Sequence, residues 1–147
     1  MFVDGMLSAT RKRFVAIGDD AALIDAARLL LDPAIDLIVV HDPDGLLAGV
    51  ITKTDVVRRI SQCSGSACAT ASSMVMIRDV VFCRTDAFLH EVWSLMKERG
   101  LKNIPVVGQD SRAIGVLNAR DALEVLMQEA ESEESLLRDY VMCVGYH

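Results

Sequence analysis

The chain contains an internal duplication. The segment GVITKTD at residues 49–55 and the segment GVLNARD at residues 115–121 start 66 positions apart (115 minus 49), and the residues before them align at the same offset without a gap. The aligned pairs include Asp20 and Asp86, Ala21 and Ala87, Leu23 and Leu89, Leu29 and Leu95, Ile38 and Ile104, and Val40 and Val106. Each copy alone would bury only about 60% of its unfolded surface. We therefore expect two structural units that share one core.

Each copy is predicted to follow the order β-α-β-β-α. Apolar residues recur at the i, i+3, i+4, i+7 spacing of a helix, at Leu23, Ala26, Ala27 and Leu30 and at Leu89, Val92, Trp93 and Met96. The candidate caps and stop signals of these helices are Asp19 or Asp20 with Pro33, and Thr85 or Asp86 with Gly100. Strands are expected at 14–17, 35–40 and 46–51 and at 80–83, 101–107 and 113–117. The fold class is therefore α/β (α+β), with two pseudo-symmetric repeats packed as one module.

These elements set the expected boundaries. They are a first repeat at 14–60, a linker rich in Ser, Ala and Gly at 61–75, a second repeat at 76–127 and an acidic helical tail at 128–147. The tail carries Leu136, Leu137, Tyr140 and Val141 at helical spacing, so it should dock on its own chain or on a second subunit. The basic run at 11–13 is interpreted as a solvated lead-in to the first strand.

Composition argues against several classes of function. The net charge is -6 and the only basic run is 11–13, which disfavours a nucleic-acid surface. No apolar stretch approaches the ~18 residues of a membrane span, and the first ten residues lack the pattern of a signal peptide. We expect a soluble cytoplasmic protein that contacts neither nucleic acid nor membrane.

The residues that build metal centres and catalytic sites are scattered. The four cysteines are Cys63, Cys68, Cys83 and Cys143, and the three histidines are His41, His90 and His147. Cys63 and Cys68 have no second Cys or His pair at ligand spacing, so no metal site is expected. No nucleophile turn stands beside a plausible base, so no enzyme is expected.

The first repeated segment combines residues that bind sugars and phosphates. A buried strand leads to Thr52, and Asp55 follows in the first turn of a helix, where unpaired N–H groups and the helix dipole favour anions. Thr52, Lys53 and Thr54 offer hydroxyl and ammonium donors, and a carboxylate can accept bonds from two ribose hydroxyls. The alternative is purely structural, because Thr-x-x-Asp is also a capping box. Asn118 and Asp121 form a similar pair in the second copy, and spacing alone does not decide between the two interpretations.

The set of motifs resembles a tandem pair of CBS (cystathionine-β-synthase) domains, a Bateman module, over about residues 14–127. The resemblance lies in the two copies of glycine, an apolar pair, Thr or Asn, two variable residues and Asp, and in the strand IPVV at 104–107. Met76 ahead of Asp79-Val80-Val81, and the helix lead-in at 85–87, also match. Asn118 departs from the usual Thr or Ser, and Val39 stands where Pro would be expected.

The resemblance implies an adenosine-ligand sensor in which AMP, ADP, ATP, NAD(H) or S-adenosylmethionine binds between the paired domains. It implies that Asp55 and Asp121 hold ribose, that Thr52 holds ribose or phosphate, and that the strand with Ile104 and Pro105 packs on the base. The expected ligand-binding residues are Thr52, Lys53, Thr54, Asp55, Arg58, Ile104, Pro105, Asn118, Arg120 and Asp121.

The sequence thus favours a non-enzymatic regulatory module that requires no cofactor, binds an adenosine nucleotide such as AMP, ATP or NADH, and forms a homodimer through its second helices. The regulated target is expected to be a separate protein of unknown identity. Two alternatives stay open. One is an interaction or dimerisation module without a small ligand, and the other, more remote, is a small nucleotide hydrolase.

Overall fold

The structure is a computed structural model that describes residues 1–62 and 69–145. Cys63 and Cys68, and part of the expected linker, lie outside the described residues. The first repeat contains β1 (Ala16–Gly18), α2 (Leu23–Leu29), β2 (Leu37–His41), β3 (Leu47–Thr52) and α3 (Lys53–Gln62). The second contains β4 (Cys83–Arg84), α4 (Leu89–Arg99), β5 (Asn103–Val107), β6 (Ala113–Asn118) and α5 (Ala119–Gly145). The expected β-α-β-β-α order is confirmed in both copies.

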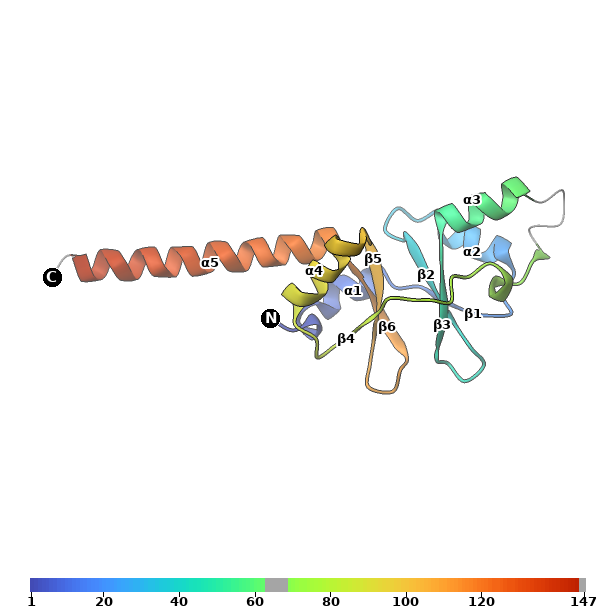
Figure 1. Cartoon of the computed structure of the whole chain (residues 1–147), viewed down its shortest axis with the longest axis horizontal. Helices are drawn as coiled ribbons and strands as arrows, with labels where there is room; N and C mark the ends of the chain where they lie inside the picture. The colour runs from blue at the N-terminus through green and yellow to red at the C-terminus, as the bar shows by residue number, and fades with distance from the viewer. Residues whose placement is uncertain (63–68, 146–147) are drawn as a thin grey trace.

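Each repeat forms a three-stranded sheet, in the order β1-β2-β3 or β4-β5-β6. The first strand runs parallel to the second, and the second and third form an antiparallel hairpin. The register is the same in both copies, since Ile17 pairs with Val40 and Cys83 pairs with Val106, and the two pairs are related by the 66-residue offset. The sheets lie side by side at the centre of the molecule (Figure 1). Between them, a small apolar cluster joins the repeats through Leu37, Val39, Val50 and Val116.

The segment that precedes each repeat packs on the other repeat. A 3-10 turn η1 (Val3–Met6) and helix α1 (Leu7–Lys12) come before the first repeat, yet Val3 and Met6 are buried in the core of the second. The segment that contains η3 (Ser72–Met74) comes before the second repeat, yet Met76 belongs to the core of the first. The chain therefore passes from one repeat to the other twice, and the repeats are interlocked. We call residues 1–13 and 70–81 the crossing segments.

The first helix of each repeat is capped by a crossing segment and not by a side chain. The N-cap residues of α2 and α4 are Ala22 and Phe88, and neither makes a side-chain cap. Backbone carbonyls of the crossing segments accept the first helical N–H groups instead, because Leu23 N donates to Thr70 O at 2.8 Å and Leu89 N donates to Met1 O at 2.9 Å. The expected caps by Asp19 or Asp20 and by Thr85 or Asp86 are therefore wrong. At the other end of α4 the predicted stop at Gly100 is confirmed, with a left-handed φ of 67°.

The glycine that opens each repeated motif is explained by these crossings. A methyl group added at Gly49 would lie 2.7 Å from the backbone oxygen of Ile77, which pairs with Val50. A methyl group at Gly115 would lie 2.6 Å from the hydroxyl of Thr10 in α1. Both glycines therefore allow a crossing segment to approach the third strand of the sheet.

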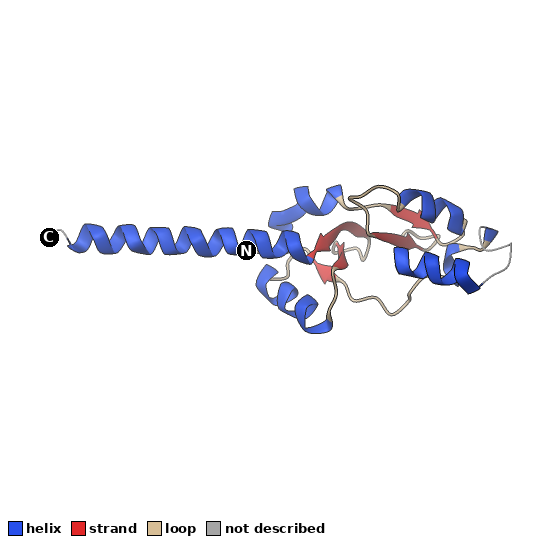
Figure 2. Cartoon of the chain, turned by 90° about the horizontal axis from the view of Figure 1, so that it is seen from above, coloured by secondary structure: helices blue, strands red, loops and turns tan. Residues whose placement is uncertain are grey.

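Helix α5 extends well beyond the body of the molecule (Figures 1 and 2). It contains 27 residues, and residues 131–139 are all exposed. Docking of this part on its own chain is therefore wrong, while docking on a second subunit stays a prediction. None of the helices in the described residues combines the length and apolar character needed to cross a membrane.

Candidate functional site

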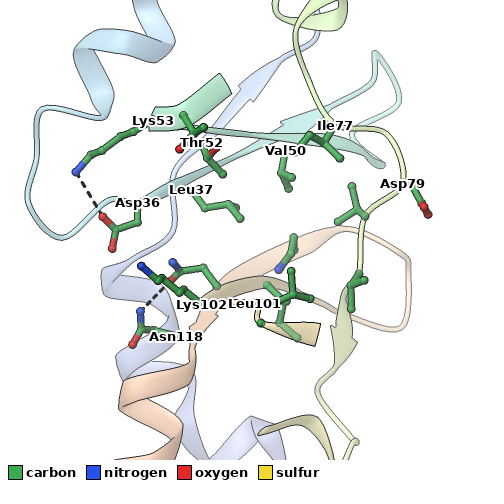
Figure 3. Close-up of a pocket in the computed structure, with 17 residues that line it drawn as sticks. Asp36, Leu37, Val50, Thr52, Lys53, Ile77, Asp79, Leu101, Lys102 and Asn118 are labelled. Carbon is green, nitrogen blue, oxygen red and sulfur yellow. Dashed lines mark hydrogen bonds and ion pairs between the residues drawn. The ribbon is translucent and has the colours of Figure 1, made fainter. Parts of the chain in front are cut away.

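A cleft of about 590 Å³ lies between the two repeats. One wall comes from the first repeat, at the start of β2 and the junction of β3 with α3. The facing wall comes from the second repeat, around the start of β5, and the crossing segment at 77–81 closes one side (Figure 3). The cleft therefore borders the cluster that joins the two sheets, since Leu37 and Val50 belong to both.

The structure brings six of the ten expected ligand-binding residues together. The residues that line the cleft are Thr52, Lys53, Thr54, Ile104, Pro105 and Asn118. The other four, Asp55, Arg58, Arg120 and Asp121, do not line it. The cleft therefore combines the first copy's motif with the second copy's IPVV strand and with Asn118 of the second copy's motif.

Apolar side chains form much of the cleft wall. They are contributed by both repeats and by the crossing segment, and include Leu37, Val50, Ile77, Val80, Val81 and Leu101. The sequence did not assign these residues to the site, although Val50 stands in the repeated motif at 49–55 and Val80 and Val81 stand in a motif of the family resemblance. The others could not be found from spacing, because the cleft depends on contacts between distant segments.

Polar and charged groups gather at one side of the cleft. Lys53 Nζ lies 3.4 Å from Asp36 Oδ1, and Asn118 Nδ2 donates to Asn103 Oδ1 at 2.9 Å. Lys102 is exposed, lines the cleft next to this group and forms no ion pair with another described residue. Asp79 lies at the opposite side of the cleft (Figure 3). The cleft thus offers a basic, hydroxyl-rich side and one separate carboxylate.

The junction of β3 and α3 is a capping box. Thr52 donates its backbone N–H and its hydroxyl to Asp55 Oδ2, each at 2.9 Å, and Asp55 N donates to Thr52 Oγ1 at 3.4 Å. Asp55 is only 7% exposed, and its Oδ1 lies 3.8 Å from Arg58 Nη1. The capping interpretation of Thr-x-x-Asp therefore describes this structure, and it holds Thr52 at the edge of the cleft.

The corresponding junction of β6 and α5 is built differently. Asn118 Oδ1 accepts the N–H groups of Arg120 and Asp121, at 3.0 and 3.2 Å, so it caps the helix alone. The Asp121 carboxylate binds Arg13 instead, with Arg13 Nε 2.6 Å from Oδ2 and Nη2 3.1 Å from Oδ1. This bond raises the pKa of Arg13 against the opposing effect of burial. Arg13 is therefore part of a bidentate ion pair and not of a solvated lead-in.

Comparison with known families places both repeats in one group. The CBS domain family matches the chain twice, over residues 7–62 and 71–128. Among curated proteins, the magnesium transporter MgtE of Thermus thermophilus is 30% identical over 84% of this chain and 26% of its own length. The uncharacterized protein MJ1426 of Methanocaldococcus jannaschii is 24% identical over 79% of this chain and 88% of its own length. The chain thus spans about a quarter of MgtE and most of MJ1426.

Solved structures share the same fold. The CBS domain pair of protein MJ0100, in complex with 5-methylthioadenosine and S-adenosyl-L-methionine, has a TM-score of 0.71 at 20% identity, covering 88% of this chain and 98% of that one. CBSX2 in complex with AMP has a TM-score of 0.72 at 19% identity, covering 88% and 98%. The cytosolic domain of the Mg²⁺ channel MgtE in complex with ATP has a TM-score of 0.64 at 27% identity, covering 78% and 45%.

Proposed function

Because the chain belongs to the CBS domain family and carries two CBS domains in tandem, we propose that it is a regulatory module that binds an adenosine-containing ligand in the cleft between its repeats. The observation that carries this proposal is the cleft itself, in which an apolar wall meets a basic, hydroxyl-rich side at the start of α3. Three of the similar structures hold adenosine compounds, namely 5-methylthioadenosine with S-adenosyl-L-methionine, AMP and ATP.

The distribution of groups in the cleft suits a nucleotide. A purine is flat and largely apolar, and it fits between the side chains of the crossing segment and the strand that carries Ile104 and Pro105. A phosphate is favoured at the opposite side, where Lys102, Lys53 and the Thr54 hydroxyl can donate hydrogen bonds, while the Thr52 hydroxyl already donates to Asp55. The start of α3 adds its backbone N–H groups and the positive end of its dipole.

Four of the expected ligand-binding residues lie outside the cleft, two at the start of α3 and two at the start of α5. Asp55 and Arg58 lie behind Thr52, so Asp55 acts by holding Thr52 in position, and it reaches ribose only if the capping box opens. Arg120 and Asp121 start α5 and belong to the other junction. Two other carboxylates line the cleft, namely Asp36, which pairs with Lys53, and Asp79, which is available for ribose hydroxyls.

The proposed role is regulatory and not catalytic. Within residues 1–62 and 69–145, no group of three or more His, Cys, Asp or Glu side chains could hold a metal ion. We propose that the module acts in the cytoplasm as a homodimer on a separate protein target. The apolar side chains Val57 and Ile60 on α3 and Leu123 and Met127 on α5 are exposed, which supports a dimer face on the second helices.

One alternative has a specific observation in its favour. The capping box explains Thr52 and Asp55 without any ligand, as an interaction module without a small molecule would require. Thermal denaturation with AMP, ATP, NADH and S-adenosylmethionine separates the two functions. Ligand at a hundredfold excess over its dissociation constant should add about 2.7 kcal/mol to the free energy of unfolding. A guanosine nucleotide should raise the melting temperature less. If no compound shifts the transition of folded protein, the interaction module is favoured.

A further inference from the structure

The part of α5 that projects from the body is strongly acidic. The charged side chains between residues 129 and 139 are Glu129, Glu131, Glu133, Glu134, Arg138 and Asp139. Residues 131–139 are all exposed, and Leu136 and Leu137 are 68% and 65% exposed among these charges. This segment therefore combines negative charge with apolar side chains that its own repeat does not cover.

A helix of this composition gains little stability from its own side chains. Across residues 129–139 the structure shows one ion pair, between Arg138 Nη2 and Glu134 Oε1 at 3.2 Å. Glu129 and Glu133 are four residues apart and Glu131 and Glu134 are three apart, so like charges adjoin on the helix surface and repel. Short helices without tertiary packing are marginal in water. The projecting segment therefore needs a partner that covers its apolar side chains and supplies positive charge.

Helix α3 presents the complementary surface. Val57 and Ile60 are 65% and 52% exposed, and because they are three residues apart they share one side of the helix. Arg58 and Arg59 follow Val57 and flank this side. Within residues 53–62 the one carboxylate is Asp55, which is buried in the capping box. The solvent side of α3 is therefore apolar at its centre and basic at its edges.

These two surfaces do not meet within one chain. Helix α5 projects from the second repeat, at the end of the molecule opposite to α3 (Figure 1). The acidic segment therefore lies far from the basic helix of its own chain. It can reach an α3 only on another molecule.

Pairing of α5 with α5 of a second copy is disfavoured by the same charges. In a parallel pair in register, each glutamate at 129–134 lies level with its own counterpart. In an antiparallel pair that sets Leu137 opposite Ala130, Glu133 and Glu134 of one helix meet Glu134 and Glu133 of the other. Charges that flank a helix pair select its partner, and opposed carboxylates weaken it. Charge complementarity therefore favours α3 over α5 as the partner helix.

We infer that the projecting segment of α5 docks on the exposed side of α3 of a second copy, so that its two leucines cover Val57 and Ile60 while its glutamates pair with Arg58 and Arg59. This inference rests on the proposed homodimer and names the segments that hold its two copies together. The contact continues the proposed dimer face, whose α5 part lies just before the projecting segment. A twofold axis uses the contact twice, once for each α5.

Photo-cross-linking in the full chain tests this contact. The photoreactive residue p-benzoylphenylalanine replaces Ser135, which is exposed within the projecting segment, and the protein is mixed with isotope-labelled wild type. Mass spectrometry should find cross-links from position 135 to residues 53–62 of the labelled copy. Cross-links to α5 or to the second repeat of the labelled copy would overturn the inference, as would the absence of cross-links between copies.

Charge reversal tests the same contact by affinity. Glu131→Arg with Glu133→Arg on α5 should raise the dissociation constant of the dimer about tenfold, and so should Arg58→Glu with Arg59→Glu on α3. Because the charges are then exchanged, the four changes together should restore most of the affinity in analytical ultracentrifugation. If the fourfold variant binds no better than either double variant, the pairing of these surfaces is wrong.

A matched control and an AMP titration complete the test. Glu91→Arg with Glu98→Arg on α4 makes the same charge change as the α5 variant at exposed positions, and should leave the dimer unchanged. None of the substituted residues lines the cleft, so AMP binding is measured independently of the contact. Cross-linking to α3 without AMP binding contradicts the proposed ligand and supports this inference. AMP binding by a protein without the cross-link overturns the inference and leaves the ligand proposal standing.

Discussion

Thr52 and Asp55 are bound to each other reciprocally at the edge of the inter-repeat cleft. Two donors of Thr52 share one oxygen of Asp55, each at 2.9 Å, while Asp55 N donates to the Thr52 hydroxyl at 3.4 Å. Asp55 is buried and Thr52 lines the cleft. A residue outside the cleft therefore controls the geometry of one that lines it.

This relationship predicts two effects of Asp55→Ala. Loss of the cap should lower the free energy of unfolding by about 1 kcal/mol, and loss of Thr52 positioning should weaken AMP affinity about tenfold, or 1.4 kcal/mol. Asp121→Ala should weaken affinity less, because Asp121 lies outside the first cleft. Calorimetry on variants shown to be folded measures both. If Asp121→Ala abolishes binding while Asp55→Ala binds normally, this ranking of the two sites is wrong.

The hairpin turns of the two repeats predict a stabilising substitution. Gly45 and Ser111 are equivalent at the 66-residue offset, and both have positive φ, 84° and 64°. A left-handed conformation costs a residue with a side chain about 1 kcal/mol relative to glycine. Ser111→Gly should therefore raise the free energy of unfolding by about that amount, measured by urea denaturation. Gly45→Ser is the reverse control and should destabilise. Lower stability of Ser111→Gly would show that the Ser111 side chain makes a compensating contact.

Burial of Cys83 predicts its reactivity. This side chain is 6% exposed, and desolvation raises the pKa of its thiol from 9.0 to about 12. The thiol should therefore resist iodoacetamide at pH 8 in the folded protein and react after unfolding in urea, as peptide mapping by mass spectrometry can show. As pH rises from 9 to 12 the unfolded thiol ionises before the folded one, so the stability contributed by Cys83 is lost over this window. Equal labelling rates with and without urea would contradict its burial.

The proposed dimer predicts a mass of about twice 16.1 kDa in light scattering. Val57 on α3 is 65% exposed, and Val57→Glu should produce a monomer because it places a charge in the apolar face. Leu31→Glu is the matched control, since Leu31 is 81% exposed outside the second helices. Deletion after Glu134 should weaken the dimer if the tail crosses the contact. A wild-type monomer at micromolar concentration would exclude the dimer.

Much of the fold could be predicted from the sequence because its signals are local and repeated. The 66-residue offset located both hairpins, both apolar helix stripes and the pair of helix starts. The crossing segments could not be predicted in the same way. Residues 7–12 and 70–77 show no clear periodicity, and their partners lie in the other repeat, as the bonds from Leu23 N to Thr70 O and from Val50 N to Ile77 O show.

The same limit applies to the site. Thr52, Lys53 and Asn118 were found because they stand in the repeated motif, whereas Asp36 and Lys102 enter the cleft through packing between repeats. Arg13 was interpreted as solvated, because nothing local in a basic run indicates a carboxylate 108 residues away in the sequence.

The central claim is that the cleft between the repeats binds an adenosine nucleotide with its phosphate toward Lys102. Calorimetric titration of AMP into Lys102→Glu and Arg138→Glu tests this claim most directly. The two changes alter net charge equally, but Lys102 lines the cleft and Arg138 is exposed on the projecting part of α5. A charge-assisted hydrogen bond contributes about 1.5 to 3 kcal/mol, so Lys102→Glu should weaken binding at least tenfold and Arg138→Glu should not. Equal affinities for both variants and wild type, or no binding of AMP by any of them, would contradict the account.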